Sequence, residues 1–310
     1  MRRRIVIGLL VGALACGAPP PQPRRRRPRA RPSGPPPPPN PPGTTLPADL
    51  LHARAAALRE RLAGRGFTVV VEPPFVVAGD EAPAEVERRA ATIIRRAVLR
   101  LKAQYFPADP WEVVEVYMFR DEASYRHHAR ALFDERPDTP FGFYTPTHEA
   151  VLMNIAAGEG TLVHELVHPF VAANFPACPT WFNEGLASLY EHCEDVRGEL
   201  VGRINWRLPP LQAAIRAGDT PPLAGLLTTT YDEFHSVWRV GLHYAQSRYL
   251  CYYLQERGLL RNYYTQLRTT AAGDPTGRML LLQTVGALDL ERFSADWQAY
   301  VLALPPPAAQ

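Results

Sequence analysis

Cysteine is scarce in this sequence, which has four cysteines in 310 residues and no Cys-x-x-C spacing. Because zinc sites built from thiolates usually carry such paired cysteines, the scarcity argues against a site of that kind. The apolar run near the N-terminus, Ile5–Ala15, has eleven residues and is too short to cross a bilayer as a stable helix. The sequence also lacks an internal repeat.

Acidic residues are missing from the first 47 positions, which carry nine arginines. The remaining residues 48–310 then hold 25 basic against 31 acidic side chains, a net charge of −6, although the whole chain has +3. Nucleic-acid-binding domains show a strong basic bias, and this part of the chain has none. The sequence therefore predicts no nucleic-acid partner.

The first 16 residues have the order of a secretory signal. Arg2–Arg4 precede the apolar run, and the run ends at Gly12-Ala13-Leu14-Ala15-Cys16. This order resembles a bacterial lipoprotein signal, which implies an exported protein held in the cell envelope, periplasmic or at the outer membrane, by a membrane lipid anchor at Cys16. Ala13 stands where such signals usually have Leu. Ordinary cleavage with an unmodified Cys16 is the alternative.

Residues 17–47 form a tether that contains fourteen of the 33 prolines. Such a stretch cannot pack a core and favours polyproline II, which rises about 3.1 Å per residue, so thirty residues reach on the order of 90 Å. The basic run Arg24–Arg31 can contact anionic head groups or serve only as a solvated spacer. Residues 48–305 are long enough for one domain with two lobes, and 306–310 form a tail.

The central motif is His164-Glu165-Leu166-Val167-His168, an H-E-x-x-H pattern. Residues four apart lie on one face of a helix, so His164 and His168 can hold one metal ion. Glu165 stands beside that face, within reach of a metal-bound water. Pro169 follows directly and cannot donate a backbone hydrogen bond, which predicts a kink.

A second helical pattern opens at Trp181-Phe182-Asn183-Glu184-Gly185, and Thr180 is placed to cap it. Glu184 lies on its polar face and can be the third protein ligand, which leaves a fourth position to water, as in catalytic zinc sites. Glu191 is the next candidate for this ligand. Asn183 and Glu191 are also placed to orient the ligands.

HELVH followed by WFNEGLASLYE resembles the gluzincin metallopeptidases, the peptidase MA-like clan that includes thermolysin. The match covers about a third of the chain. It implies zinc held by His164, His168 and Glu184, with Glu165 as the catalytic base. It also implies a thermolysin-like α+β fold: a strand-rich lobe over 48–160, the H-E-x-x-H helix, and a helical lobe over 161–305. A metzincin would need Gly and His where Val171 and Asn174 stand, so that class is excluded.

The implied function is zinc-dependent hydrolysis of peptide bonds in a protein or peptide substrate. Tyr244-Ala245-Gln246-Ser247-Arg248-Tyr249-Leu250 resembles a helix of the same clan that carries a tyrosine near zinc. Tyr244 is therefore the candidate catalytic stabiliser of the oxyanion, with His243 and His235 as rivals. Thermolysin-like aminopeptidases have a G-x-M-E-N segment that is absent here, which favours an endopeptidase. The alternative is an envelope scaffold or binding protein of the same fold without turnover.

Hydrophobic patterns predict the other elements. Glu149–Ile155 is expected to be the edge strand bordering the site, where an extended peptide can add as a further strand. The expected helices span 48–64, 81–105, 121–133, 209–217, 239–257, 259–270, 276–285 and 290–303, and the expected strands span 67–71, 75–77, 111–119, 141–145 and 149–155.

Three cysteines follow the signal region, and export would allow disulfides among them. Cys178 and Cys193 bracket the Glu184 helix, whose ends would be about 20 Å apart if the helix filled this interval, whereas a disulfide needs Cα atoms within about 7 Å. Pairing of either residue with Cys251 is equally allowed. At least one of the three must stay without a partner in the domain.

Overall fold

The computed structural model describes residues 37–307, except 138, 146 and 237–239. The expected signal segment with Cys16, and the tether up to residue 36, lie outside the described residues. None of the helices in the described part of the chain combines the length and hydropathy that a membrane crossing requires.

The described chain is an α+β protein, as the sequence predicted, with a five-stranded mixed sheet in its N-terminal half. The strand order is β1-β2-β3-β5-β4. The three inner strands run parallel, and the two outer strands pair antiparallel with their neighbours. The strands are β1 (Thr68–Glu72), β2 (Phe75–Gly79), β3 (Val114–Phe119), β4 (Gly142–Thr145) and β5 (Ala150–Asn154).

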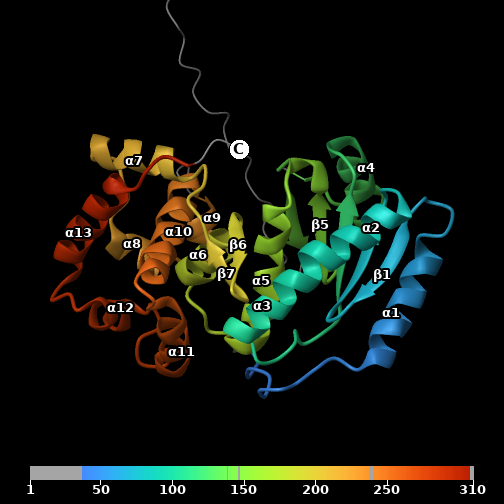
Figure 1. Cartoon of the computed structure of the whole chain (residues 1–310), viewed down its shortest axis with the longest axis horizontal. Coiled ribbons are helices and arrows are strands. Elements are labelled where there is room, and N and C mark those ends of the chain that lie inside the picture. The colour runs from blue at the N-terminus through green and yellow to red at the C-terminus, as the bar shows by residue number, and fades with distance from the viewer. Residues whose placement is uncertain (1–36, 138, 146, 237–239, 308–310) are drawn as a thin grey trace, which may run out of the picture.

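Helices cover both faces of this sheet (Figure 1). One face packs against α1 (Ala48–Arg61) and α4 (Glu122–Phe133). The other packs against α5 and a continuous helical run. Because both faces are covered, the inner strands are buried along their whole length. The run, expected as one helix over 81–105, consists of α2 (Pro83–Arg89), a π-helical turn (Ala90–Arg95) and α3 (Arg96–Gln104).

The rest of the chain is mostly helical, as predicted, and α5 lies between it and the sheet (Figure 1). The β6–β7 hairpin and the short helices α8 and α9 were not predicted. The elements are α5 (Gly160–Asn174), α6 (Thr180–Leu189), β6 (Cys193–Val196), β7 (Glu199–Gly202), α7 (Leu208–Ala217), α8 (Leu223–Thr228), α9 (Tyr231–Ser236), α10 (Val240–Glu256), α11 (Leu260–Thr270), α12 (Arg278–Val285) and α13 (Leu290–Ala303).

The prediction that Glu149–Ile155 forms the edge strand is wrong. β5 pairs with β3 on one side and with β4 on the other, so the edge strand is β4. The sequence carries the reason, because Ala150–Met153 is an unbroken apolar run of the kind that a strand buried on both faces requires. The hairpin itself was predicted correctly, but its outer strand is the one that comes first in the chain.

One local expectation at a helix end also needs correction. Thr180 does not cap α6: it is the first helical residue, Pro179 holds the capping position, and no side chain bonds the free amides there. α5 contains Pro169 and continues as helix to Asn174, and the kink at Pro169 stays a prediction. Proline is tolerated at this point although the bond from residue 169 to the Glu165 carbonyl cannot form.

No disulfide joins the cysteines of the described residues. Cys178, Cys193 and Cys251 are all free thiols. Cys193 begins strand β6, four residues after the last residue of α6, and Cys251 is buried in α10. The pairings that the sequence left open are therefore absent.

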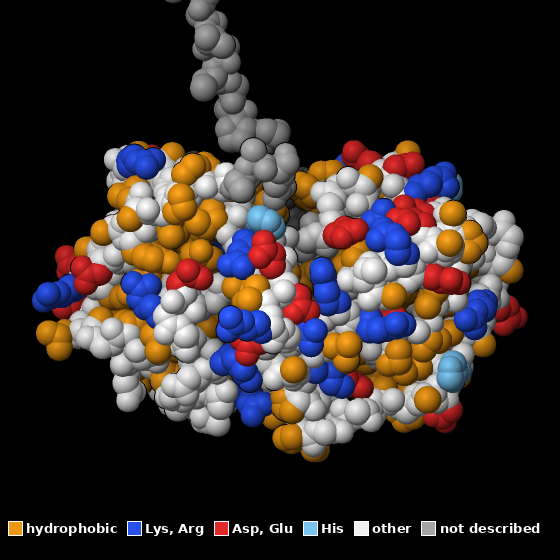
Figure 2. All heavy atoms as spheres, in the orientation of Figure 1, with side chains coloured by type: hydrophobic (Ala, Val, Ile, Leu, Met, Phe, Trp, Pro, Cys, Tyr) orange, Lys and Arg blue, Asp and Glu red, His pale blue; other side chains and the backbone are white. Residues whose placement is uncertain are grey.

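Charges of both signs alternate over the face that carries α2 and α3 (Figure 2). Arginines there pair with nearby carboxylates, as in Arg88–Glu85, Arg89–Glu81 and Arg100–Asp195. These ion pairs agree with the lack of a basic excess in residues 48–310, and the absence of a nucleic-acid partner stays a prediction.

Gly185 allows α6 and α10 to pack closely. A Cβ atom at this position would lie 2.6 Å from the Ser247 carbonyl oxygen and 2.9 Å from Cys251 Sγ. We expect Gly185→Ala to lower the free energy of unfolding by about 1–3 kcal/mol because the added methyl overpacks this contact. Chemical denaturation followed by circular dichroism measures the change.

Gly225→Ala is the matched control. Gly225 also lies in a helix, α8, but a Cβ atom there meets nothing within 4 Å. This variant should be as stable as the wild type or gain up to about 1 kcal/mol, since alanine favours helix over glycine. Equal stability of Gly185→Ala and the wild type would contradict the close approach of α6 and α10.

Candidate metal centre

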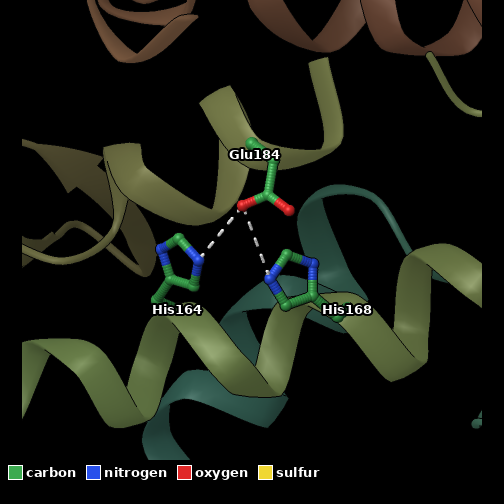
Figure 3. A group of neighbouring side chains, drawn as sticks. All are labelled: His164, His168 and Glu184. Atoms are coloured by element: carbon green, nitrogen blue, oxygen red, sulfur yellow. Dashed lines mark ion pairs between the residues drawn. The ribbon is translucent and has the colours of Figure 1, made fainter. Parts of the chain in front are cut away.

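The H-E-x-x-H residues lie on the buried part of α5. The apolar side chains of α5 pack into the core, and His164 and Glu165 are therefore buried as well. His164 is 3% exposed and Glu165 is 1% exposed. His168 follows one turn later, and the two imidazole rings lie 5.0 Å apart between centroids. Both rings point from α5 toward α6 (Figure 3).

Glu184 of α6 completes a three-residue group. Its Oε2 atom lies 3.4 Å from His164 Nε2 and 3.9 Å from His168 Nε2 (Figure 3). The three potential ligand atoms are all within 4.8 Å of one another. The sequence prediction that these three side chains meet is therefore confirmed.

The group fits a metal ion. Glu184 is 2% exposed, and its Oε2 atom accepts no hydrogen bond from the described residues although two imidazole nitrogens face it. A buried carboxylate oxygen without a hydrogen-bond donor lowers the stability of the folded protein unless a cation lies beside it. Two imidazoles and one carboxylate are a donor set that can bind a divalent ion and leave a coordination position open.

The outer nitrogens of both imidazoles face oxygen atoms. His164 Nδ1 lies 3.2 Å from Glu191 Oε1, and His168 Nδ1 lies 3.1 Å from Asn183 Oδ1. Arg207 donates two hydrogen bonds to Glu191, from Nε at 2.7 Å and from Nη2 at 2.6 Å. Such contacts fix ring orientation and tautomer, so that Nε2 of each ring faces Glu184.

Electrostatics at the group favour a bound positive charge. Burial alone raises the pKa of Glu184, but the His168, His164 and His235 imidazoles outweigh it and hold this pKa well below its usual range. Burial lowers the pKa of His164, but the nearby carboxylates of Glu184 and Glu191 overcome this effect and raise the pKa to about 9. Burial dominates at His168, whose pKa is lowered.

Glu191 is ionised as well, because the Arg207 charge overcomes the effect of burial and lowers the Glu191 pKa to about 2. Two carboxylates therefore surround His164, and a cation between the imidazoles and Glu184 would balance them.

A backbone amide of the edge strand holds Glu165. The Tyr144 N–H donates a hydrogen bond of 3.0 Å to Glu165 Oε2. Asn154 N–H bonds the Phe141 carbonyl, and the alternation of an antiparallel ladder then turns the Tyr144 amide away from β5. The edge strand thus fixes one carboxylate oxygen of Glu165 beside the first metal-ligand candidate.

Two of the three candidates for the oxyanion stabiliser lie at this group. The Tyr244 hydroxyl is 3.0 Å from His235 Nε2, and the same nitrogen is 3.4 Å from Glu184 Oε1. The Arg207 guanidinium stacks over the Tyr244 ring, 4.9 Å from its centroid. His243 instead packs its ring against Phe234, at 5.3 Å. The structure thus brings Tyr244 and His235 together with Glu184.

Arg207 and the Tyr144 amide were not found from the sequence. Arg207 comes from the loop before α7, sixteen residues from its partner Glu191, and no spacing rule connects them. The Tyr144 contact uses a backbone group, which every residue but proline has. The contact between the Tyr144 amide and Glu165 could have been predicted only from the strand order, which makes β4 the edge strand.

In comparisons with known proteins, no family model matches this chain and no curated protein matches its sequence. The assignment of the metal centre therefore rests on the geometry of the residues described above.

Removal of any of the three ligand candidates should release the metal. His164→Ala, His168→Ala and Glu184→Ala should each weaken metal binding at least about a hundredfold, since three protein ligands are what such sites use. Mass spectrometry of metal content after dialysis against a fixed free zinc concentration measures this loss. His127→Ala, which changes an exposed histidine on α4, is the control and should keep full occupancy.

A folded Glu184→Ala protein with stoichiometric metal would show that the third ligand was chosen wrongly. Glu191 would then be the alternative, although the structure places it against the outer nitrogen of His164.

Proposed function

We propose that this protein is a zinc-dependent metallopeptidase of the gluzincin type, with a thermolysin-like arrangement of its two lobes. The observation that carries the proposal is the placement of Glu165. This buried carboxylate follows the first ligand candidate, is not part of the His164–His168–Glu184 group, and is held by the edge strand of the sheet.

Two imidazoles and one carboxylate would hold zinc, which supplies a water of pKa near 7 and polarises the substrate carbonyl when bound. Glu165 accepts the proton of the attacking water and delivers it to the leaving amine. The Tyr144 amide keeps Glu165 Oε2 fixed during this transfer, so the carboxylate does not have to reorient.

Tyr244 and His235 act on the developing oxyanion. The Tyr244 residue is 7% exposed, the His235 side chain is 6% exposed, and the two contact each other beside Glu184. Hydrogen-bond donors that are fixed in a buried site stabilise developing negative charge far better than they would in water. The Arg207 guanidinium over the Tyr244 ring restrains that ring further.

The edge strand β4 favours an extended polypeptide as the substrate. Its outer side faces Glu165, and a peptide that pairs with an exposed strand edge is bound through its own backbone, largely independent of sequence. The sequence lacks the G-x-M-E-N segment that holds a substrate amino terminus in related aminopeptidases. Cleavage within a chain is therefore the mode that we propose.

Export and anchoring extend this proposal. The lipoprotein-type order of residues 1–16 supports attachment to a membrane of the cell envelope through Cys16, and the proline-rich tether would hold the catalytic domain away from it. The substrates would then be envelope proteins or peptides.

Glu165→Gln separates a peptidase from a scaffold. The amide keeps the size of the side chain and can still accept the Tyr144 hydrogen bond, but it cannot take a proton from water. We expect zinc content and folding to stay unchanged while peptide cleavage falls about 10²- to 10⁴-fold, the usual contribution of a general base. Cleavage is measured on a peptide selected from a proteome-derived library by the wild type.

Glu122→Gln, at an exposed glutamate of α4, serves as the control and should cleave like the wild type. If the wild type binds zinc and cleaves no peptide, while it and Glu165→Gln bind an envelope partner with equal affinity, the protein is a scaffold rather than an enzyme.

A further inference from the structure

The proline-rich stretch Pro35–Pro42 contains one residue that is not proline, Asn40. Proline has no N–H, so Asn40 is the one position in this stretch with a backbone hydrogen-bond donor. A spacer needs no such donor, because a polyproline II chain makes no internal hydrogen bonds.

Asn40 uses this donor on the helix of the metal centre. Its N–H bonds the carbonyl oxygen of Ala173 at 2.7 Å, and its side-chain Nδ2 bonds the Asp109 carbonyl at 3.1 Å. Ala173 lies in the last turn of α5, where carbonyl groups have no partner within the helix. Asn40 therefore caps the C-terminal end of α5 from outside.

The residues after Asn40 follow the loop between α3 and β3. The Gly43 N–H donates a hydrogen bond of 2.9 Å to the Pro107 carbonyl. The Asp109 N–H donates one of 2.9 Å to the Thr44 carbonyl, and Asp109 Oδ2 accepts one of 3.0 Å from the Leu46 N–H. Lys102 pairs with the other carboxylate oxygen of Asp109.

The same loop is fastened to α5. Asn174, 1% exposed, accepts a bond from the Ala108 N–H at 3.0 Å and donates one to the Ala108 carbonyl at 2.9 Å. It also donates to the Phe170 carbonyl at 2.9 Å. Residues 40–46, the loop and the end of α5 thus form one hydrogen-bonded unit.

This unit matters for the metal centre because of Pro169. Its missing N–H removes one bond of α5 directly after His168, so the last turn is held less firmly by the helix itself. The hydrogen bonds that Asn40 and Asn174 make to α5 stabilise the part of the helix that follows Pro169.

We propose that Asn40 is a positioning residue of the metal centre: it fastens the end of the tether to α5 and thereby keeps the two histidines in place. The inference goes beyond the proposed peptidase function and does not depend on catalysis.

Asn40→Pro in the full chain tests the proposal, with Asn40→Ala and Pro38→Ala as matched controls. Asn40→Pro completes the polyproline run and removes both hydrogen bonds, whereas Asn40→Ala keeps the N–H. We expect zinc affinity, measured by competition with a chromophoric chelator, to fall about tenfold or more in Asn40→Pro, the lower range of the effect of groups that orient ligands. Asn40→Ala should lose less than Asn40→Pro, and Pro38→Ala should match the wild type.

Hydrogen exchange provides a second measurement that needs no variant. A peptic peptide covering residues 35–42 has one exchangeable backbone amide, that of Asn40. In the wild type this amide should exchange at least about tenfold more slowly than in an unstructured chain, and zinc should slow it further, because coupling between two sites is reciprocal.

Unchanged zinc affinity in Asn40→Pro would overturn the proposal. Exchange of the Asn40 amide at the unstructured rate, or at a rate that zinc does not alter, would do so as well. If the wild type binds no zinc at all, the assignment of the metal centre is wrong. Slow exchange of the Asn40 amide would then still show that this residue is hydrogen-bonded to the domain.

Discussion

The approach of Glu184 to His164 and His168 is the contact on which the rest of this structure depends. An ionised carboxylate in a protein interior costs several kcal/mol unless it is paired, so α6 is stable in this position only if imidazoles or a cation face its glutamate. The close packing of α6 on α10 at Gly185 then brings the α10 residue Tyr244 to the same point.

The site draws on both halves of the molecule. The sheet supplies the Tyr144 amide to Glu165, while the helical half supplies Glu184, His235, Tyr244 and the Glu191–Arg207 pair. α5 lies between them and contributes the two histidines. Asn40 bonds the far end of this helix, and residues 43–46 bond the loop between α3 and β3, so the last part of the tether belongs to the same hydrogen-bonded framework.

The three residues of the candidate metal centre could be predicted from the sequence because their signals are local. His164 and His168 follow from helical spacing, and Glu184 follows from the polar face of a second amphipathic helix. The edge strand could not be predicted, because strand order depends on contacts between distant segments, and the apolar run at Ala150–Met153 was given too little weight.

Contacts through backbone groups or between distant loops were also invisible in the sequence. The Tyr144 amide and the Asn40 amide have no residue signature beyond the absence of proline, and Arg207 reaches Glu191 only once the β6–β7 hairpin has turned the chain back. The Tyr244 assignment rested on a resemblance, and the structure adds its contact with His235.

X-ray absorption at the zinc edge of the purified, zinc-loaded protein tests the central claim most directly. Cys251 is a free thiol beside Gly185, the neighbour of Glu184 in the sequence, so the measurement also tests sulfur ligation. We expect two imidazole ligands and oxygen donors at about 2.0–2.2 Å, with no sulfur at about 2.3 Å. Sulfur in the first coordination shell, or fewer than two imidazoles, would contradict a centre built from His164, His168 and Glu184.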